Sequence, residues 1–306
     1  MPVKVWLALA LLLAAGLRWA GSASVGEATR FGSADLAYGK RGVMPGEFQK
    51  PRAIAIDAQD RVYVVDMKAE IAVFDVDGKL LRSWHTPTHE FGRPSGLACA
   101  GGSLVVADSH YHRLLIYSPE GQLQRTIGGD DAEGPLKGYF GYIADVAVDA
   151  AGNFYVAESN ERERITKLSP AGSILKSWGE RGPHEGQFSR IRALALGPDG
   201  ELYVADALNH RVQVFSPEGT HRRTIGAGLL QYPYDVVVAA DGTAYVTEWA
   251  DGRVRRFDRT GQATGAWGER GRGPGQLDQP WALALDSRGR LHVADAMNHR
   301  IQRVTP

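Results

Sequence analysis

Carboxylate residues recur along this chain, each at the end of a short apolar stretch such as Val-Val-Asp or Val-Ala-Asp. The six acids are Asp66, Asp108, Glu158, Asp206, Glu248 and Asp295. A ring of carboxylates could bind calcium, which prefers oxygen ligands. A scaffolding role explains the pattern more simply, because an acid at a turn accepts hydrogen bonds from nearby backbone amides. We therefore expect each acid to accept hydrogen bonds from the amides of its own loop, and we keep calcium as the alternative.

An arginine accompanies most of these acids at a nearly fixed spacing. It follows the acid by five residues in four cases and by six residues in a fifth, at Arg113, Arg211, Arg253, Arg300 and Arg164. The first acid lacks such an arginine, and Glu70 stands in that region instead. Because isolated ion pairs add little stability, we expect these arginines to orient the acids.

A second polar cluster consists of His110 and His112, which flank Tyr111. Two histidines at this spacing could bind zinc or another transition metal. The chain has one cysteine, Cys99, and no third metal ligand can be placed beside the pair from the sequence. We therefore predict no metal cofactor, with zinc as the alternative at this place. We take His110 and Tyr111 as candidate ligand-binding residues.

The chain is built from six similar segments, which position the recurring residues. The segments begin at Pro51, Pro94, Ile143, Ile191, Pro233 and Pro280, at spacings of 43, 49, 48, 42 and 47 residues. Each contains short strands joined by tight Gly, Pro or Asp turns, and the first two strands are almost wholly apolar. Four short strands at this period are typical of a β-propeller blade. We predict an all-β fold, a six-bladed β-propeller of four-stranded blades, with the more charged third and fourth strands, such as residues 253–256, toward the rim.

The last segment stops after its third strand, and the N-terminal part of the chain offers the missing one. Residues 32–39 (GSADLAYG) match the fourth strand of the third segment, residues 172–179 (GSILKSWG). The loops that follow agree as well, since residues 39–42 read GKRG where residues 179–182 read GERG. Closing the ring removes unpaired strand edges. We therefore predict that the ring is closed by an N-terminal strand completing the last blade.

Two of the segments share a longer motif. Residues 203–215 read YVADALNHRVQVF, and residues 292–302 read HVADAMNHRIQ. This motif resembles the NHL repeat, and the resemblance covers about residues 31–306. It implies a propeller without implying one function, because one fold serves many functions. The NHL family includes RNA-binding domains, sensor domains of bacterial kinases and peptide-amidating lyases, and the related lactonase-like and synthase-like propellers are enzymes.

The second residue of each segment lies at the start of the innermost strand, which in a propeller points at the mouth of the channel. Around the ring these residues are Arg52, Ser95, Ala144, Arg192, Tyr234 and Trp281. The resemblance to the amidating lyases implies zinc-binding histidine at this position in some blades, and none of the six is histidine. Arginine grips carboxylates and phosphates, and Tyr and Trp offer stacking surfaces. We take Arg52, Arg192, Tyr234 and Trp281 as candidate ligand-binding residues for an anionic or sugar-like ligand or a peptide end.

The N-terminal residues are typical of an export signal. Lys4 precedes the apolar residues 5–17, and small residues follow at 20–23. This apolar run is shorter than the roughly 17–25 residues that a membrane-spanning helix needs. We predict a signal peptide or membrane anchor over residues 1–23 and an NHL-repeat propeller over residues 24–306. The predicted location is secreted or periplasmic, with a membrane tether as the alternative if the segment stays uncleaved.

The charge balance excludes one class of partner. The chain has 35 basic and 35 acidic residues, so it lacks the basic excess of a nucleic-acid-binding domain, and we predict no nucleic-acid partner. We expect a monomeric, non-catalytic binding platform outside the cytoplasm, with a protein, peptide or glycan ligand. The alternative is a metal-dependent lyase or hydrolase related to the peptide-amidating or lactonase-like propellers. Against it, the sequence shows no nucleophile–base pair and no cluster of three metal ligands.

Overall fold

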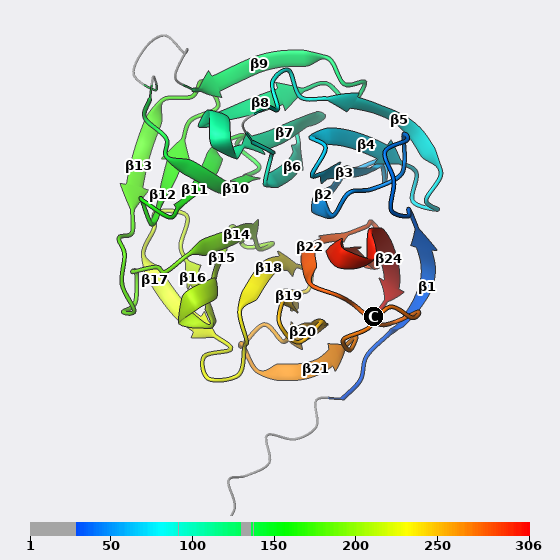
Figure 1. The fold of residues 1–306 in the computed structure, drawn as a ribbon. Coiled ribbons are helices and arrows are strands. Elements are labelled where there is room, and N and C mark those ends of the chain that lie inside the picture. Colours follow the sequence, from blue (N-terminus) through cyan, green and yellow to red (C-terminus); the bar gives the residue numbers. More distant parts are fainter. Residues whose placement is uncertain (1–28, 91, 130–135, 137) are drawn as a thin grey trace, which may run out of the picture.

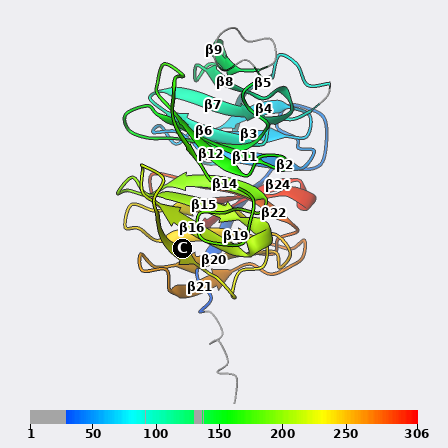
Figure 2. The ribbon, with the colours of Figure 1, turned by 90° about the vertical axis from the view of Figure 1, so that its left-hand side faces the viewer.

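The structure, a computed structural model, describes residues 29–90, 92–129, 136 and 138–306. These residues form a ring of six antiparallel four-stranded sheets (Figure 1), which Figure 2 shows from its side. The predicted all-β, six-bladed propeller is therefore confirmed. The predicted signal peptide or anchor over residues 1–23 lies outside the described residues. In the described part of the chain, no helix has the length and apolar character needed to cross a bilayer.

Each blade runs from an innermost strand beside the channel to an outermost strand at the rim. The first blade contains β2 (Pro51–Ile56), β3 (Val62–Asp66), β4 (Glu70–Phe74) and β5 (Leu80–His85), and the second contains β6 (Gly96–Ala100), β7 (Ser103–Asp108), β8 (Arg113–Tyr117) and β9 (Leu123–Gly128). The third contains β10 (Tyr142–Val148), β11 (Phe154–Ser159), β12 (Arg164–Leu168) and β13 (Ile174–Trp178), and the fourth contains β14 (Ile191–Leu196), β15 (Leu202–Asp206), β16 (Arg211–Phe215) and β17 (His221–Ile225).

The last two blades follow the same order. The fifth contains β18 (Pro233–Val238), β19 (Ala244–Glu248), β20 (Arg253–Phe257) and β21 (Ala263–Trp267), and the sixth contains β22 (Pro280–Leu285), β23 (Leu291–Asp295), β24 (Arg300–Thr305) and β1 (Ser33–Tyr38). Single 3-10 turns follow the second strand of three blades, at η1 (Ser109–Tyr111), η2 (Ala207–Asn209) and η3 (Ala296–Asn298).

The hydrophobic core lies between the blades. The described residues form six apolar clusters, and each cluster is shared by two neighbouring blades around the ring. In the second, Tyr63 and Val65 of β3 pack with Leu115 of β8. Every residue of β3, β15 and β23 is buried. Strands covered on both faces need continuous apolar sequence, which explains the composition of the first two strands.

Because each blade buries its faces only against its neighbours, the ring must close, and β1 closes it. This strand pairs antiparallel with β24, from Ser33 opposite Thr305 to Tyr38 opposite Ile301. The predicted completion of the last blade by an N-terminal strand is therefore confirmed. The chain just before β1 also touches the fifth blade, where the Phe31 amide donates to the Ala266 carbonyl of β21 at 3.2 Å.

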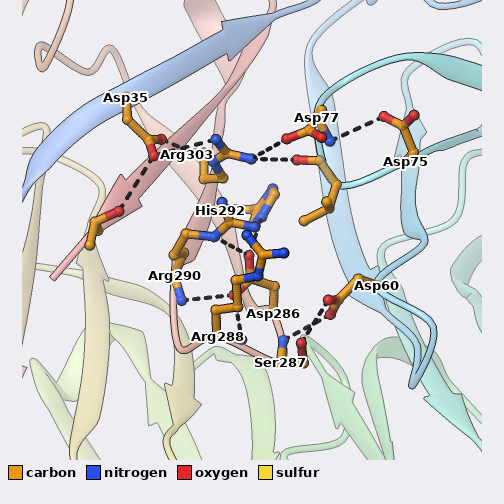
Figure 3. A network of polar contacts seen from close by, with 12 residues as sticks. Asp35, Asp60, Asp75, Asp77, Asp286, Ser287, Arg288, Arg290, His292 and Arg303 are labelled. Carbon is orange, nitrogen blue, oxygen red and sulfur yellow. Dashed lines mark hydrogen bonds and ion pairs between the residues drawn. The ribbon is translucent and has the colours of Figure 1, made fainter.

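Charged groups link the sixth and first blades at their boundary, which we call the seam (Figure 3). Arg303 of β24 donates to the Asp35 carboxylate of β1 at 2.9 Å and to the Asp77 carboxylate of the first blade at 3.0 Å. On the same seam, the Asp60 carboxylate accepts hydrogen bonds from the amide and the hydroxyl of Ser287 at 2.8 and 2.6 Å. Arg303 is only 8% exposed, whereas the side chains of its partners Asp35 and Asp77 are 38% and 78% exposed.

Candidate ligand site at the channel mouth

The six carboxylates that end the second strands are at most 1% exposed and lie inside their blades. Five of them accept a hydrogen bond from the expected arginine, with Nε to oxygen distances between 2.6 and 2.9 Å. In the first blade, Lys68 takes the place of the arginine and lies 3.6 Å from Asp66 and 2.7 Å from Glu70. The acids therefore belong to the internal scaffold of each blade.

The expected source of their amide hydrogen bonds was wrong. Only Asp66 accepts an amide hydrogen bond from its own loop, from Lys68, among the contacts of the described residues. Amides that lie 17 residues before the acid donate instead, from the loop that enters the blade, at Gln49, Gly141, Ser189, Gln231 and Asp278. Five of the six acids thus hold the entering loop at the end of the second strand. The exception is Asp108, whose Oδ1 is buried without a hydrogen-bond partner among the described residues.

The third strand adds a further donor to this scaffold. In the fourth and sixth blades, Gln213 and Gln302 donate to Asp206 and Asp295 at 3.1 Å. In the fifth blade, Arg255 donates to the Glu248 carboxylate at 2.9 Å and is 5% exposed. Residues 253–256 lie on β20, the third strand outward from the channel, as expected, and the Arg255 guanidinium turns from there to the buried acid.

A cavity of about 330 Å³ runs along the channel, between the edges of the innermost strands. Five of the six residues predicted at the mouth line it, namely Arg52, Ser95, Arg192, Tyr234 and Trp281. The sixth, Ala144, is 4% exposed and packs into the cluster between the third and fourth blades instead. The structure thus brings together the four residues that we selected at this position as ligand-binding candidates.

Arg192, Tyr234 and Trp281 form a stack at one side of the mouth. The Tyr234 and Trp281 rings are parallel within 5° at a centroid distance of 5.9 Å. The Arg192 guanidinium carbon lies 4.5 Å from the centre of the Tyr234 ring. Its Nη2 lies 3.4 Å from the Tyr232 hydroxyl, and its Nε is buried without a hydrogen-bond partner among the described residues. The neighbouring rings therefore hold this arginine in place, and its Nε remains available to donate a hydrogen bond to a ligand.

Arg52 lies at another part of the mouth, beside Tyr142. Its Nη2 donates to the Tyr142 hydroxyl at 3.1 Å, and its Nη1 lies 3.8 Å from the Met67 sulfur. His110 packs edge-on against the Tyr142 ring at 5.3 Å, so this predicted residue joins the Arg52 group. Burial and the nearby Arg52 charge lower the pKa of His110, which favours its neutral form.

Tyr111, the remaining candidate, has a ring contact with the scaffold. The Arg113 guanidinium, which binds the buried Asp108, lies 4.9 Å from the centre of the Tyr111 ring. Its neighbour His112 adopts a left-handed backbone with φ of 52° and ends the η1 turn. In the described ranges, no group of three or more His, Cys, Asp or Glu side chains is placed to share a metal ion.

Sequence reasoning missed several residues of the mouth and channel. Tyr142 and Tyr232 precede the segment starts by one residue, and Trp249 lies 5.6 Å from Tyr232 between ring centres. Asp145 and Asp235 line the same cavity as the two arginines. They stand where other innermost strands carry Ala or Gly, and this interruption of an apolar strand was the signal that could have found them.

The electrostatic character of the mouth is set by its guanidinium groups. Their neighbours are phenols, and burial raises the pKa of the Tyr234 phenol, an effect that Arg192 and Arg52 oppose. This phenol is therefore neutral near pH 7 and offers no negative charge to the arginines. Two cations beside neutral aromatic rings can hold a carboxylate or phosphate group, with a flat portion of the ligand against the stack.

Comparison with known sequences identifies relatives of several kinds. The chain is 41% identical to peptidyl-glycine alpha-amidating monooxygenase A of Xenopus laevis over 148 residues, which cover 46% of this chain and 16% of that protein. It is 25% identical to the chloroplastic protein SUPPRESSOR OF QUENCHING 1 of Arabidopsis thaliana over 261 residues, 69% of this chain and 25% of that protein. The chain therefore spans about a quarter or less of these two relatives.

Solved structures share the fold. A protein of unknown function from Bacteroides thetaiotaomicron matches with a TM-score of 0.68 and 16% identity, over 90% of this chain and 76% of that one. Virginiamycin B lyase from Staphylococcus aureus matches with a TM-score of 0.60 and 14% identity, over 84% of this chain and 95% of that one. At these identities the likeness concerns the fold alone.

Family profiles agree with the repeat architecture. The profile described as SMP-30/Gluconolactonase/LRE-like region matches residues 53–269, which is more than half of the chain. The NHL repeat profile matches residues 277–304 in the sixth blade. The chain therefore belongs to the SMP-30/gluconolactonase/LRE-like family and is an NHL-repeat β-propeller.

Proposed function

We propose that this propeller is a non-catalytic binding platform that works outside the cytoplasm. It holds an anionic ligand, or the anionic part of a peptide, protein or glycan, at the channel mouth. Arg52 and Arg192 bind the anion, and the Tyr234–Trp281 stack contacts the flat part of the ligand. The export-type pattern of residues 1–23 supports the location.

One contrast within the molecule carries the proposal. Five scaffold arginines are each paired with a buried carboxylate. Among the described residues, the partners of Arg52 and Arg192 are instead phenols, an aromatic face and a thioether. A partly buried charge without a counter-charge is costly, and an anionic ligand removes that cost. The two arginines therefore differ from the scaffold in the way expected of a binding site.

The test is the affinity of the full chain for small carboxylates and inorganic phosphate, measured by calorimetry. Changing Arg52→Gln and Arg192→Gln together removes both charges while keeping polar side chains of similar length. We expect affinity to fall at least about tenfold, since each charged hydrogen bond contributes about 1.5–3 kcal/mol. Arg259→Gln is the matched control, because Arg259 is 74% exposed, and it should bind as the wild type does. Full affinity in the double variant would contradict the proposal.

The competing hypothesis of a metal-dependent lyase or hydrolase needs its own measurement. Metal analysis of the purified protein, after dialysis against chelator-free buffer, separates the two hypotheses. A folded protein with well below one equivalent of zinc or calcium agrees with the binding platform. Near-stoichiometric zinc or calcium would overturn the non-catalytic proposal and direct attention to the enzymes among the relatives.

A further inference from the structure

Two acidic residues line the channel cavity together with the two arginines. Asp145 lies on β10 and Asp235 on β18, and each is one residue further along its strand than the mouth position. A strand advances about 3.3 Å per residue, so the acids lie only a few ångströms deeper than the arginine positions. Of the described residues that line the cavity, Arg52 and Arg192 are the cations and Asp145 and Asp235 are the acids.

The acids are held by backbone amides of the neighbouring blades. The Asp145 carboxylate accepts a hydrogen bond from the Leu194 amide at 2.9 Å. The Asp235 carboxylate accepts one from the Leu283 amide at 2.6 Å and one from its neighbour Val236 at 2.7 Å. These bonds fix the direction of each carboxylate without supplying a positive charge.

The surroundings of the acids disfavour their negative charge. Burial raises the pKa of Asp235 to about 7. Burial also raises the pKa of Asp145 well above its usual range, and the charge of Asp235 adds to this effect. Each carboxylate oxygen can accept more than one hydrogen bond, so both acids keep acceptor capacity toward the cavity. A cationic hydrogen-bond donor in the cavity would supply the positive charge that the carboxylates of Asp145 and Asp235 lack.

We infer that the channel binds a zwitterionic ligand, with its carboxylate at Arg52 and Arg192 and its ammonium group at Asp145 and Asp235. This inference rests on the proposed function for the carboxylate end. The two acids lie one strand position deeper than the mouth residues of their own blades, and this arrangement with a cavity of about 330 Å³ suits a free amino acid or the amino-acid-like end of a larger molecule. The apolar part of the ligand lies against the Tyr234–Trp281 stack.

Three probes of similar size test the inference by calorimetry at pH 7.5. L-phenylalanine carries both charges, 3-phenylpropanoate lacks the ammonium group, and 2-phenylethylamine lacks the carboxylate. We expect L-phenylalanine to bind about tenfold to a hundredfold more tightly than either of the others, because each charged end adds its own hydrogen bonds. Asp235→Asn should weaken L-phenylalanine binding about tenfold and leave 3-phenylpropanoate nearly unchanged. Asp199→Asn, at a 40% exposed carboxylate, is the control and should change neither affinity.

The outcomes separate this inference from the proposed function. Equal or tighter binding of 3-phenylpropanoate would overturn the zwitterion while leaving the arginine mouth in place. Full affinity for L-phenylalanine in both the Asp235→Asn variant and the Asp145→Asn variant would also overturn the zwitterion. Binding of 2-phenylethylamine alone, or of no probe at millimolar concentration, would overturn both the inference and the proposed anion site.

Discussion

Changing Asp206→Asn tests whether the buried carboxylates hold the blades together. Asp206 is fully buried and accepts hydrogen bonds from the Ser189 amide, the Asn209 side chain, Arg211 and Gln213, at 2.7 to 3.1 Å. Asparagine removes the negative charge and turns an NH2 group toward some of these donors. Arg211, whose side chain is 10% exposed, then loses its counter-charge.

Removing one partner of such a buried pair costs about 3–5 kcal/mol of unfolding free energy. For a chain of this size, that corresponds to a fall of roughly 10 °C in the unfolding temperature. Urea denaturation followed by tryptophan fluorescence measures the free energy directly. Asp199→Asn makes the same chemical change at a pair that is 4.0 Å apart and well exposed, and it should cost less than about 0.5 kcal/mol. If the two variants unfold at the same urea concentration, the scaffold role of Asp206 is wrong.

Two further predictions concern the channel and the seam. Because burial raises the pKa of Asp235 to about 7, above the value of about 3.9 in an unfolded chain, its stabilising contribution is complete below about pH 4 and is lost as the pH rises through 7. Urea denaturation at pH 5 and pH 8 should therefore show the wild type losing about 2–3 kcal/mol relative to Asp235→Asn, because only the part of the effect between pH 5 and the pKa of about 7 falls in this range. A pH-independent difference would refute this. Arg303→Met should cost about 1–2 kcal/mol, since the lost partners Asp35 and Asp77 have side chains that are 38% and 78% exposed. Hydrogen exchange should become faster in the amides of β1, whereas unchanged exchange there would show that the seam does not depend on Arg303.

The fold could be predicted because the sequence repeat shows where each blade begins and ends. Short apolar strands, turn residues and a terminal acid recur in each segment, and the mismatch between the two chain ends indicates how β1 completes the last blade. The mouth residues Arg52, Arg192, Tyr234 and Trp281 could be selected for the same reason. A fixed position in a repeat maps onto a fixed position around the ring.

The rest of the site could not be predicted because it depends on contacts between segments. Tyr142 begins β10 and Tyr232 lies in the loop just before β18, so both precede the segments defined from the sequence. Only the folded ring places their hydroxyls beside Arg52 and Arg192. Asp145 and Asp235 bond to amides of the next blade, at Leu194 and Leu283, which lie 49 and 48 residues away in sequence. The same limit explains why the amide donors to the scaffold acids were assigned to the wrong loop.

The most direct test of the anion site is a crystal structure of the protein with bound 4-bromobenzoate. This probe has a carboxylate, a flat ring and a bromine atom whose anomalous scattering marks its position. We expect one bromine peak in the channel cavity, with the carboxylate within hydrogen-bond distance of Arg192 or Arg52 and the ring beside Tyr234 or Trp281. A bromine peak only at other surfaces, with the channel mouth free of the probe at saturating concentration, would show that the mouth does not bind anions.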